Sequence, residues 1–183
     1  RILFFYKNVI QKDLITQQKT FSSCNNTQID KVQIYLSLKP FSILNPKVIL
    51  AGWFFIEALT GQKVNICFSR KDVAQWRLRK GILVGFSVVL RKENIFSFLD
   101  KFFLLIRSQK KPFNAIDFDL TQNSFQVPSE ILATIIELTG KENFFQYIQF
   151  FDLSVCLVTK QKQVNVYDSF FMFRSFLFPF IKN

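Results

Sequence analysis

The sequence predicts an α+β domain, in which helices pack on one face of a mostly antiparallel sheet and the other face is basic. Two stretches, 31–38 and 83–91, alternate apolar and polar residues, which is the period of a half-buried strand. A third stretch, 94–106, repeats its apolar residues at helical spacing. Because helices and strands are mixed and joined by short links, we expect a single layer of helices on the sheet, with a long basic loop projecting.

In the N-terminal half, a first helix over 2–19 becomes polar toward its end. A second helix follows the strand at 31–38. Its signals are Asn45 as N-cap, Pro46 at the first helical position and Gly61 as the stop. A strand over 63–68 comes next, and the basic segment after it is predicted to be a loop.

In the C-terminal half, the helix at 94–106 is predicted to start from Asn94 as its cap. The polar stretch 107–115 is predicted to be a loop, and short strands follow it. The apolar segment 129–138 fits either a helix or a strand. The chain closes with a strand at 151–159 and a helix at about 164–176.

The chain of 183 residues is long enough to bury a sizeable core and fits one domain. We expect an N-terminal lobe over about 1–82 and a C-terminal lobe over about 83–183. A membrane span needs roughly 20 consecutive apolar residues. The longest apolar runs are broken by Glu57 and by Arg174, so no membrane span is predicted.

Catalytic chemistry has few candidate residues. The chain has no histidine, which removes the commonest general base and the histidine-containing zinc sites. Its three cysteines, Cys24, Cys67 and Cys156, are far apart and are expected to be free thiols. With five glycines in all, no phosphate-binding glycine motif is present. We therefore predict no enzyme activity, no metal and no cofactor.

Positive charge is concentrated in one segment. The formal net charge is +11, and eight of the 24 cations lie between Lys63 and Lys92, where Asp72 is the single carboxylate. A local basic excess of this kind is typical of a polyanion-binding surface. The alternative is a solvated loop without a partner.

The segment 60–92, TGQKVNICFSRKDVAQWRLRKGILVGFSVVLRK, resembles the large-subunit ribosomal protein five family, the 5S-rRNA-binding proteins of bacteria and organelles. Three groups of residues match in order and without a gap. They are Gly61, Gln62 and Lys63; then Arg70, Lys71, Val73, Ala74, Trp76, Arg77, Leu78, Arg79 and Gly81; then Gly85, Val88, Leu90 and Arg91.

Weaker matches extend the resemblance over most of the chain, in the helix at 94–106, the strand FDLSVCLV and the terminus FLFPFIKN. Ser37 stands where the family has asparagine, and Val89 where it has threonine. The family's glycine- and arginine-rich stretch is replaced by the shorter, glycine-free segment 107–125.

The resemblance implies a structural protein of the central protuberance of the large ribosomal subunit. Its sheet face would bind 5S rRNA, or a replacement for it, together with large-subunit rRNA, and its loop would reach P-site tRNA and a protein of the small-subunit head. Neighbouring organellar ribosomal proteins are further expected partners. The implied rRNA-binding residues are Gln62, Lys63, Arg91, Ser37 and Gln33. The implied loop residues are Arg70, Lys71, Gln75, Trp76, Arg77, Arg79 and Lys80.

The composition indicates where in the cell the protein functions. The abundance of Phe, with 25 residues, together with Ile and Lys, is typical of an AT-rich organellar genome. A mitochondrial matrix ribosome is therefore expected, with a plastid ribosome as the alternative. A membrane-associated basic organellar protein and an RNA-modifying enzyme are the competing functions.

Overall fold

The computed structural model describes most of the N-terminal two thirds of the chain and shorter parts of the rest. The described residues are 2–18, 28–40, 45–76, 78–108, 116–119, 123–127, 132–133, 142–160, 175–176 and 180–182. The predicted helix at 164–176 and the ambiguous segment 129–138 lie almost wholly outside them.

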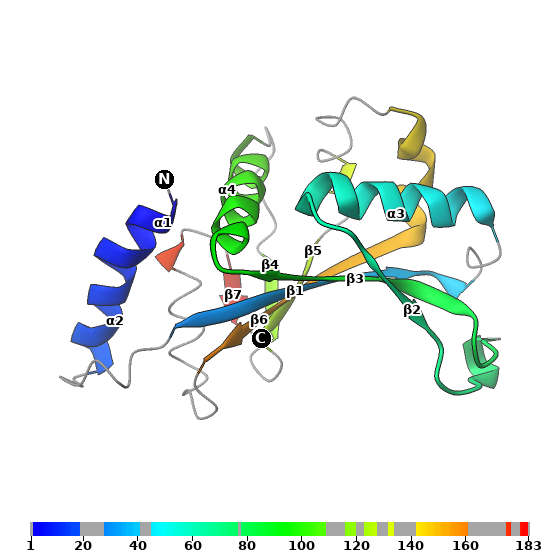
Figure 1. Ribbon diagram of the computed structural model, residues 1–183, viewed down its shortest axis with the longest axis horizontal. Coiled ribbons are helices and arrows are strands. Elements are labelled where there is room, and N and C mark those ends of the chain that lie inside the picture. Colours follow the sequence, from blue (N-terminus) through cyan, green and yellow to red (C-terminus); the bar gives the residue numbers. More distant parts are fainter. Residues whose placement is uncertain are drawn as a thin grey trace. The chain divides into compact units, whose positions relative to one another are not determined.

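Helices and strands alternate irregularly along the described chain (Figure 1). The helical elements are α1 (Ile2–Phe5), the π-helical turn η1 (Tyr6–Ile10), α2 (Gln11–Gln18), α3 (Pro46–Thr60), the 3-10 turn η4 (Ala74–Trp76), α4 (Glu93–Ser108) and the 3-10 segment η5 (Glu142–Phe150). The strands are β1 (Ile29–Leu38), β2 (Asn65–Phe68), β3 (Leu83–Arg91), β4 (Ile116–Asp119), β5 (Ser124–Val127), β6 (Phe151–Thr159) and β7 (Phe180–Lys182).

The described strands follow the order β2-β3-β1-β6-β5-β4-β7. Strand β2 pairs antiparallel with β3, and β4 pairs antiparallel with β5 but parallel with β7. The predicted α+β class with a mostly antiparallel sheet is confirmed. The predicted strands at 83–91 and 151–159 have the bounds of β3 and β6, and β1 begins two residues before the predicted strand at 31–38.

The chain forms two compact units, each assembled from separate segments. Unit 1 comprises Arg1–Gln33, Leu90–Gln126 and Val155–Asn183, and unit 2 comprises Ile34–Val89 and Val127–Ser154. These units are made of different segments from the lobes expected on either side of residue 82, and that division stays a prediction.

In unit 2, helix α3 packs closely on one face of the strands (Figure 1). A Cβ atom added at Gly52 would lie 3.1 Å from side-chain carbons of both Leu36 and Phe86. Phe55 stacks on Phe151 with 6.5 Å between ring centroids. The helix-covered core of this unit is therefore formed by the alternate, apolar residues of β1, β3 and β6, as the sequence predicts.

The ends of α3 largely follow the sequence signals. Pro46 is the first helical residue, and Gly61 ends the helix in the left-handed region at φ +68° while its N–H donates to Glu57 O at 2.8 Å. Asn45 occupies the N-cap position, but its side chain makes no capping hydrogen bond.

In unit 1, the N-terminal helical run and α4 supply the core. Tyr6 packs against Phe96 and Phe176, and its hydroxyl oxygen accepts a hydrogen bond from the Ile29 N–H at 3.2 Å. Phe102 of α4 contacts Phe125 of β5 with 5.9 Å between ring centroids. The helical spacing predicts a core face of six residues. Four of them are buried, namely Ile95, Phe98, Leu99 and Phe102. The side chains of the other two, Phe103 and Ile106, lie outside the described part of the structure.

The predicted cap of α4 is wrong. The helix begins at Glu93, so Asn94 lies inside its first turn. Lys92 adopts φ +53°, which turns the chain sharply between β3 and the helix. Glu93 is thereby the residue whose carboxylate lies in the positive first turn of the helix.

Candidate nucleic-acid interface

The basic segment between β2 and β3 is a small hydrogen-bonded hairpin. Ser69 N–H donates to Ile82 O at 2.8 Å, and Gly81 N–H donates to Ser69 O at 2.9 Å. Further out, Val73 and Leu78 exchange two backbone hydrogen bonds of 2.9 and 3.1 Å around η4. The sequence predicted only a loop here, because a two-residue bridge has no visible apolar period.

One carboxylate helps to fix the hairpin. Asp72 Oδ1 accepts a hydrogen bond of 2.6 Å from the backbone N–H of Lys80, and Ser69 Oγ donates to Lys71 O at 2.7 Å. Gly81 supports the turn with φ +84°. Hydrogen bonds within the segment therefore hold its described backbone in place.

The cations of this hairpin project into solvent. Arg70, Lys71, Arg79 and Lys80 are exposed, and Gln75 is exposed within η4. Trp76 is the last residue of η4. Arg77 lies outside the described residues.

The face of unit 2 opposite α3 carries the polar members of the alternating strands. Asn65 pairs with Ser87 across β2 and β3, and Cys67 Sγ donates to Ser87 Oγ at 3.3 Å. Tyr35 and Ser37 of β1 are exposed on this face, between buried Ile34, Leu36 and Leu38. We call the side chains of Tyr35, Ser37, Asn65, Cys67 and Ser87 the open face.

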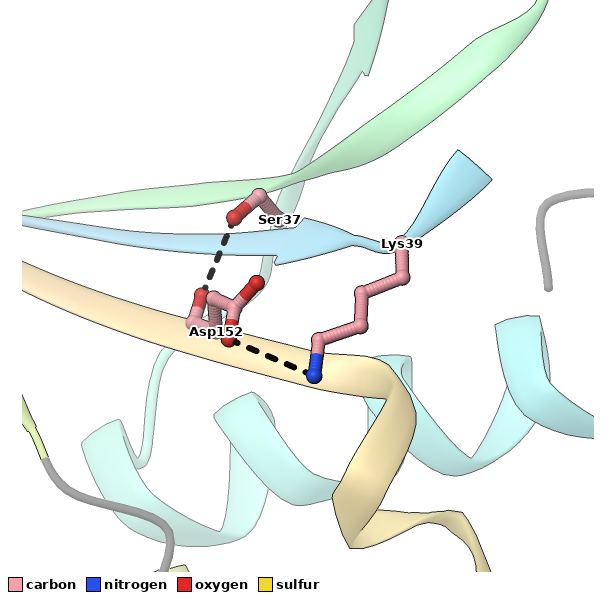
Figure 2. Close-up of polar contacts among 3 residues, drawn as sticks. All are labelled: Ser37, Lys39 and Asp152. Atoms are coloured by element: carbon pink, nitrogen blue, oxygen red, sulfur yellow. Dashed lines mark hydrogen bonds and ion pairs between the residues drawn. The ribbon is translucent and has the colours of Figure 1, made fainter. Parts of the chain in front are cut away.

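At one end of the open face, three polar groups meet (Figure 2). Ser37 Oγ donates to Asp152 O at 3.2 Å, and Lys39 Nζ lies 3.9 Å from Asp152 Oδ1. Since the Ser37 proton is used inside the protein, the Ser37 oxygen has lone pairs left to accept a hydrogen bond from a ligand. The Lys39–Asp152 pair is exposed to solvent, and exposed ion pairs contribute little stability in water.

Two further predicted RNA-binding residues follow the end of α3. The backbone N–H of Gln62 donates to Thr60 Oγ1 at 3.3 Å, and the Thr60 hydroxyl donates to Ile56 O at 2.8 Å. Gln62 is half-buried and Lys63 is exposed. The left-handed turn at Gly61 thus directs both residues away from the helix and toward β2.

The remaining two predicted residues belong to unit 1. Gln33 of β1 is half-buried. Arg91 is the last residue of β3 and is exposed, next to the sharp turn at Lys92.

Some residues of the interface were absent from the predicted set. Lys39 continues the series 33, 35, 37 on the polar side of β1, so strand alternation would have found it. Cys67 and Ser87 become neighbours only through the register of β2 and β3. Asp152 reaches Ser37 from a position 115 residues away, for which the sequence offers no local signal.

Among the described residues, no group of three His, Cys, Asp or Glu side chains could hold a metal ion. Within the same residues, no helix has the length and apolar character needed to cross a membrane.

No family model matches the chain. Individual proteins do match it. It is 29% identical over 118 residues to the large ribosomal subunit protein uL5m of Reclinomonas americana, covering 64% of each chain. It is 29% identical over 113 residues to the large ribosomal subunit protein uL5c of Cyanidioschyzon merolae, covering 62% of each chain. It is 37% identical over 98 residues to the large ribosomal subunit protein uL5 of Ruthia magnifica, covering 52% of this chain and 53% of the relative.

The chain is thus similar to proteins of the uL5 family. Its similarity to uL5 proteins of three kinds, designated uL5m, uL5c and uL5, confirms the resemblance to that family. The chain spans a little under two thirds of the length of the first two uL5 relatives.

Proposed function

We propose that this chain is a structural component of the large ribosomal subunit, without catalytic activity, and that its open face binds rRNA. The large ribosomal subunit is proposed as the assembly because the relatives are named as proteins of that subunit. The observation that carries the proposal is a helix-free sheet face of polar side chains, continuous in the chain with an exposed basic hairpin.

The chemistry of the open face suits a folded RNA. Hydroxyl, thiol and amide groups spaced along paired strands can bond ribose 2′-hydroxyl groups and phosphate oxygens, which are the groups that a folded RNA exposes. Lys39 and Lys63 border this face and are exposed. The proposed ligand is 5S rRNA or its replacement, together with large-subunit rRNA in the central protuberance. Gln62, Lys63, Ser37, Gln33 and Arg91 are the proposed contact residues.

The hairpin is suited to a second polyanion. Its four described cations are exposed, and like charges so close together repel unless counterions or phosphates lie among them. We propose that Arg70, Lys71, Gln75, Trp76, Arg77, Arg79 and Lys80 contact P-site tRNA and the head of the small subunit. Because its backbone is already hydrogen-bonded, this contact requires little ordering of the chain.

The compartment proposed is the mitochondrial matrix. Matches to both uL5m and uL5c proteins are compatible with a mitochondrial or a plastid ribosome. Organelle fractionation followed by sedimentation of ribosomal subunits decides between them. A membrane-associated protein without a ribosomal role would remain with membranes after carbonate extraction and would not sediment with the subunit.

The rRNA contact is tested by binding 5S rRNA, or a central-protuberance fragment of the large-subunit rRNA, at several salt concentrations. Arg91→Ala should weaken binding by about 1–3 kcal/mol if its guanidinium is bonded to RNA. Lys101→Ala is the matched control, because Lys101 is an exposed cation on α4. Equal affinity of wild type and both variants would remove Arg91 from the interface.

The hairpin is tested with the triple variant Arg70→Gln, Lys71→Gln and Arg79→Gln. We expect rRNA binding to persist, and tRNA retention and subunit joining to fall, with a smaller loss relative to wild type at higher salt because the variant makes fewer phosphate contacts. The control is Lys7→Gln, Lys12→Gln and Lys101→Gln, which removes the same charge from exposed helical positions. Loss of rRNA binding with normal tRNA retention would contradict the proposal that the open face binds rRNA and the hairpin contacts tRNA.

A further inference from the structure

A second surface of unit 2 lies on the side of α3 and is apolar. Four large side chains are strongly exposed there: Leu50 at 52%, Trp53 at 37%, Ile66 at 39% and Phe68 at 59%. We call these four residues the β2 edge surface. A large contiguous apolar surface is typical of a contact site rather than of free protein surface.

The four side chains are neighbours through shared partners. Ile66 pairs directly with Phe86 across β2 and β3, and the Trp53 ring lies 6.5 Å from the Phe86 ring. Phe68 lies two residues beyond Ile66 on the same side of the strand. Leu50 precedes Trp53 by three residues, which makes the two adjacent along α3.

The backbone of this surface is also available for pairing. Strand β2 stands at one end of the described strand order. Since Ser69 N–H donates toward β3, to Ile82 O, strand alternation turns the N–H and C=O groups of Ile66 and Phe68 away from β3. An exposed edge with apolar side chains is a template for an added strand.

The charges near the β2 edge surface indicate which kind of partner would bind there. Lys63 precedes β2, and Arg70 and Lys71 follow it; all three are exposed, and Asp72 is engaged by the Lys80 N–H. A second copy of the chain would bring another +11 charges to this edge, which disfavours self-pairing. RNA is disfavoured because the four side chains offer only the Trp53 indole N–H as a polar group.

From these observations we infer that β2 accepts an extended segment of a different protein, with apolar side chains at alternate positions and carboxylates at its ends. The segment adds a strand beside Ile66 and Phe68 and lays its apolar side chains against Trp53 and Leu50. The carboxylates lie in the positive potential of the chain, which carries a formal net charge of +11. This contact uses the side of the sheet opposite the proposed rRNA face.

The experiment uses the chain assembled in large ribosomal subunits, and in this respect it rests on the proposed function. A photoreactive benzoylphenylalanine replaces Phe68, and the crosslinked peptide is identified by mass spectrometry. We expect a segment of another subunit protein with alternate apolar residues flanked by Asp or Glu. The matched control replaces Phe4, which is 74% exposed in unit 1 and should not capture that segment.

A second change tests the apolar contact. Adding Ile66→Lys to the Phe68 probe should lower the yield of that crosslink at least tenfold, whereas adding Phe4→Lys should leave it unchanged. Amide hydrogen exchange at Ile66 and Phe68 should be at least tenfold slower in the subunit than in the free protein.

The outcomes separate the two proposals. If the chain does not sediment with large subunits, the proposed function fails. If it does sediment with them, then a crosslink from position 68 to RNA, to a second copy of the chain or to nothing overturns the edge inference. Unchanged exchange at Ile66 and Phe68 overturns strand pairing.

Discussion

The two faces of the strands in unit 2 are built from alternate residues of the same segments, but their surroundings differ. On one face, Leu36 and Phe86 are covered by α3 and almost wholly buried. On the other, their chain neighbours Ser37 and Ser87 make single polar contacts and no helix among the described elements covers them. The covered face supplies stability, and the open face is free to supply binding.

The contrast is sharpest at two adjacent residues of β3. Phe86→Ala should lower the free energy of unfolding by about 3–5 kcal/mol, because a fully buried ring leaves a cavity beneath α3. Ser87→Ala should change it by about 0.5 kcal/mol or less. Urea denaturation of both variants measures the difference, and equal losses would show that the two faces do not divide stability and binding as proposed.

A glycine of β3, Gly85, and a glycine of the covering helix α3, Gly52, differ in what would obstruct an added side chain. A Cβ at Gly85 would collide with the backbone oxygen of Leu36 in the neighbouring strand, whereas one at Gly52 meets only side-chain carbons at 3.1–3.3 Å. Because side chains move more readily than a paired backbone, Gly85→Ala should cost about 2–3 kcal/mol and Gly52→Ala about 1 kcal/mol. Thermal or urea unfolding gives the ranking, and the reverse order would contradict it.

The hairpin should resemble the open face in contributing little to stability. Asp72→Ala removes the acceptor of the Lys80 N–H without touching the core. We expect the global free energy of unfolding to change by about 0.5 kcal/mol or less, and the Lys80 amide to exchange about tenfold faster. Asp72→Asn, which keeps an acceptor oxygen, is the control. Global destabilisation by Asp72→Ala alone would mean that the hairpin belongs to the folding core.

The smallest expected effect concerns Cys156 of β6 in unit 1. Burial raises the pKa of its thiol above the ordinary value of 9.0, against the opposing influence of Lys31. Since the folded state holds the proton more tightly, this contribution to stability is complete at neutral pH and is lost as the pH rises past about 9. Iodoacetamide should label Cys156 more slowly at pH 8 than it labels N-acetylcysteine. Faster labelling would mean that the pKa of Cys156 is lowered rather than raised.

Much of the fold could be predicted because its signals are local. Alternation over 83–91 and 151–159 gave strands with the bounds of β3 and β6, and Pro46 and Gly61 marked the ends of α3. Local signals failed where a backbone turn intervened. Lys92 in the left-handed region starts α4 at Glu93, which leaves the predicted cap Asn94 inside the helix.

The candidate interface was only partly predictable. Charge counting found the hairpin cations, and alternation separated Ser37 from the core. Whether the predicted contact residues bind RNA stays a prediction. The hairpin's order was missed, since its Asp72–Lys80 contact joins residues eight apart and leaves no period in the sequence.

For the main helices and strands of the described residues, the sequence by itself determined the type of element, its apolar face and the position of the positive charge, because these depend on residues close together in the chain. Tertiary structure decided which polar residues meet. Ser37 lies beside Asp152, Cys67 beside Ser87, and Ile66 beside Phe86 because strand register joins them. Register is set by the packing of many side chains at once, and no short stretch of sequence contains it.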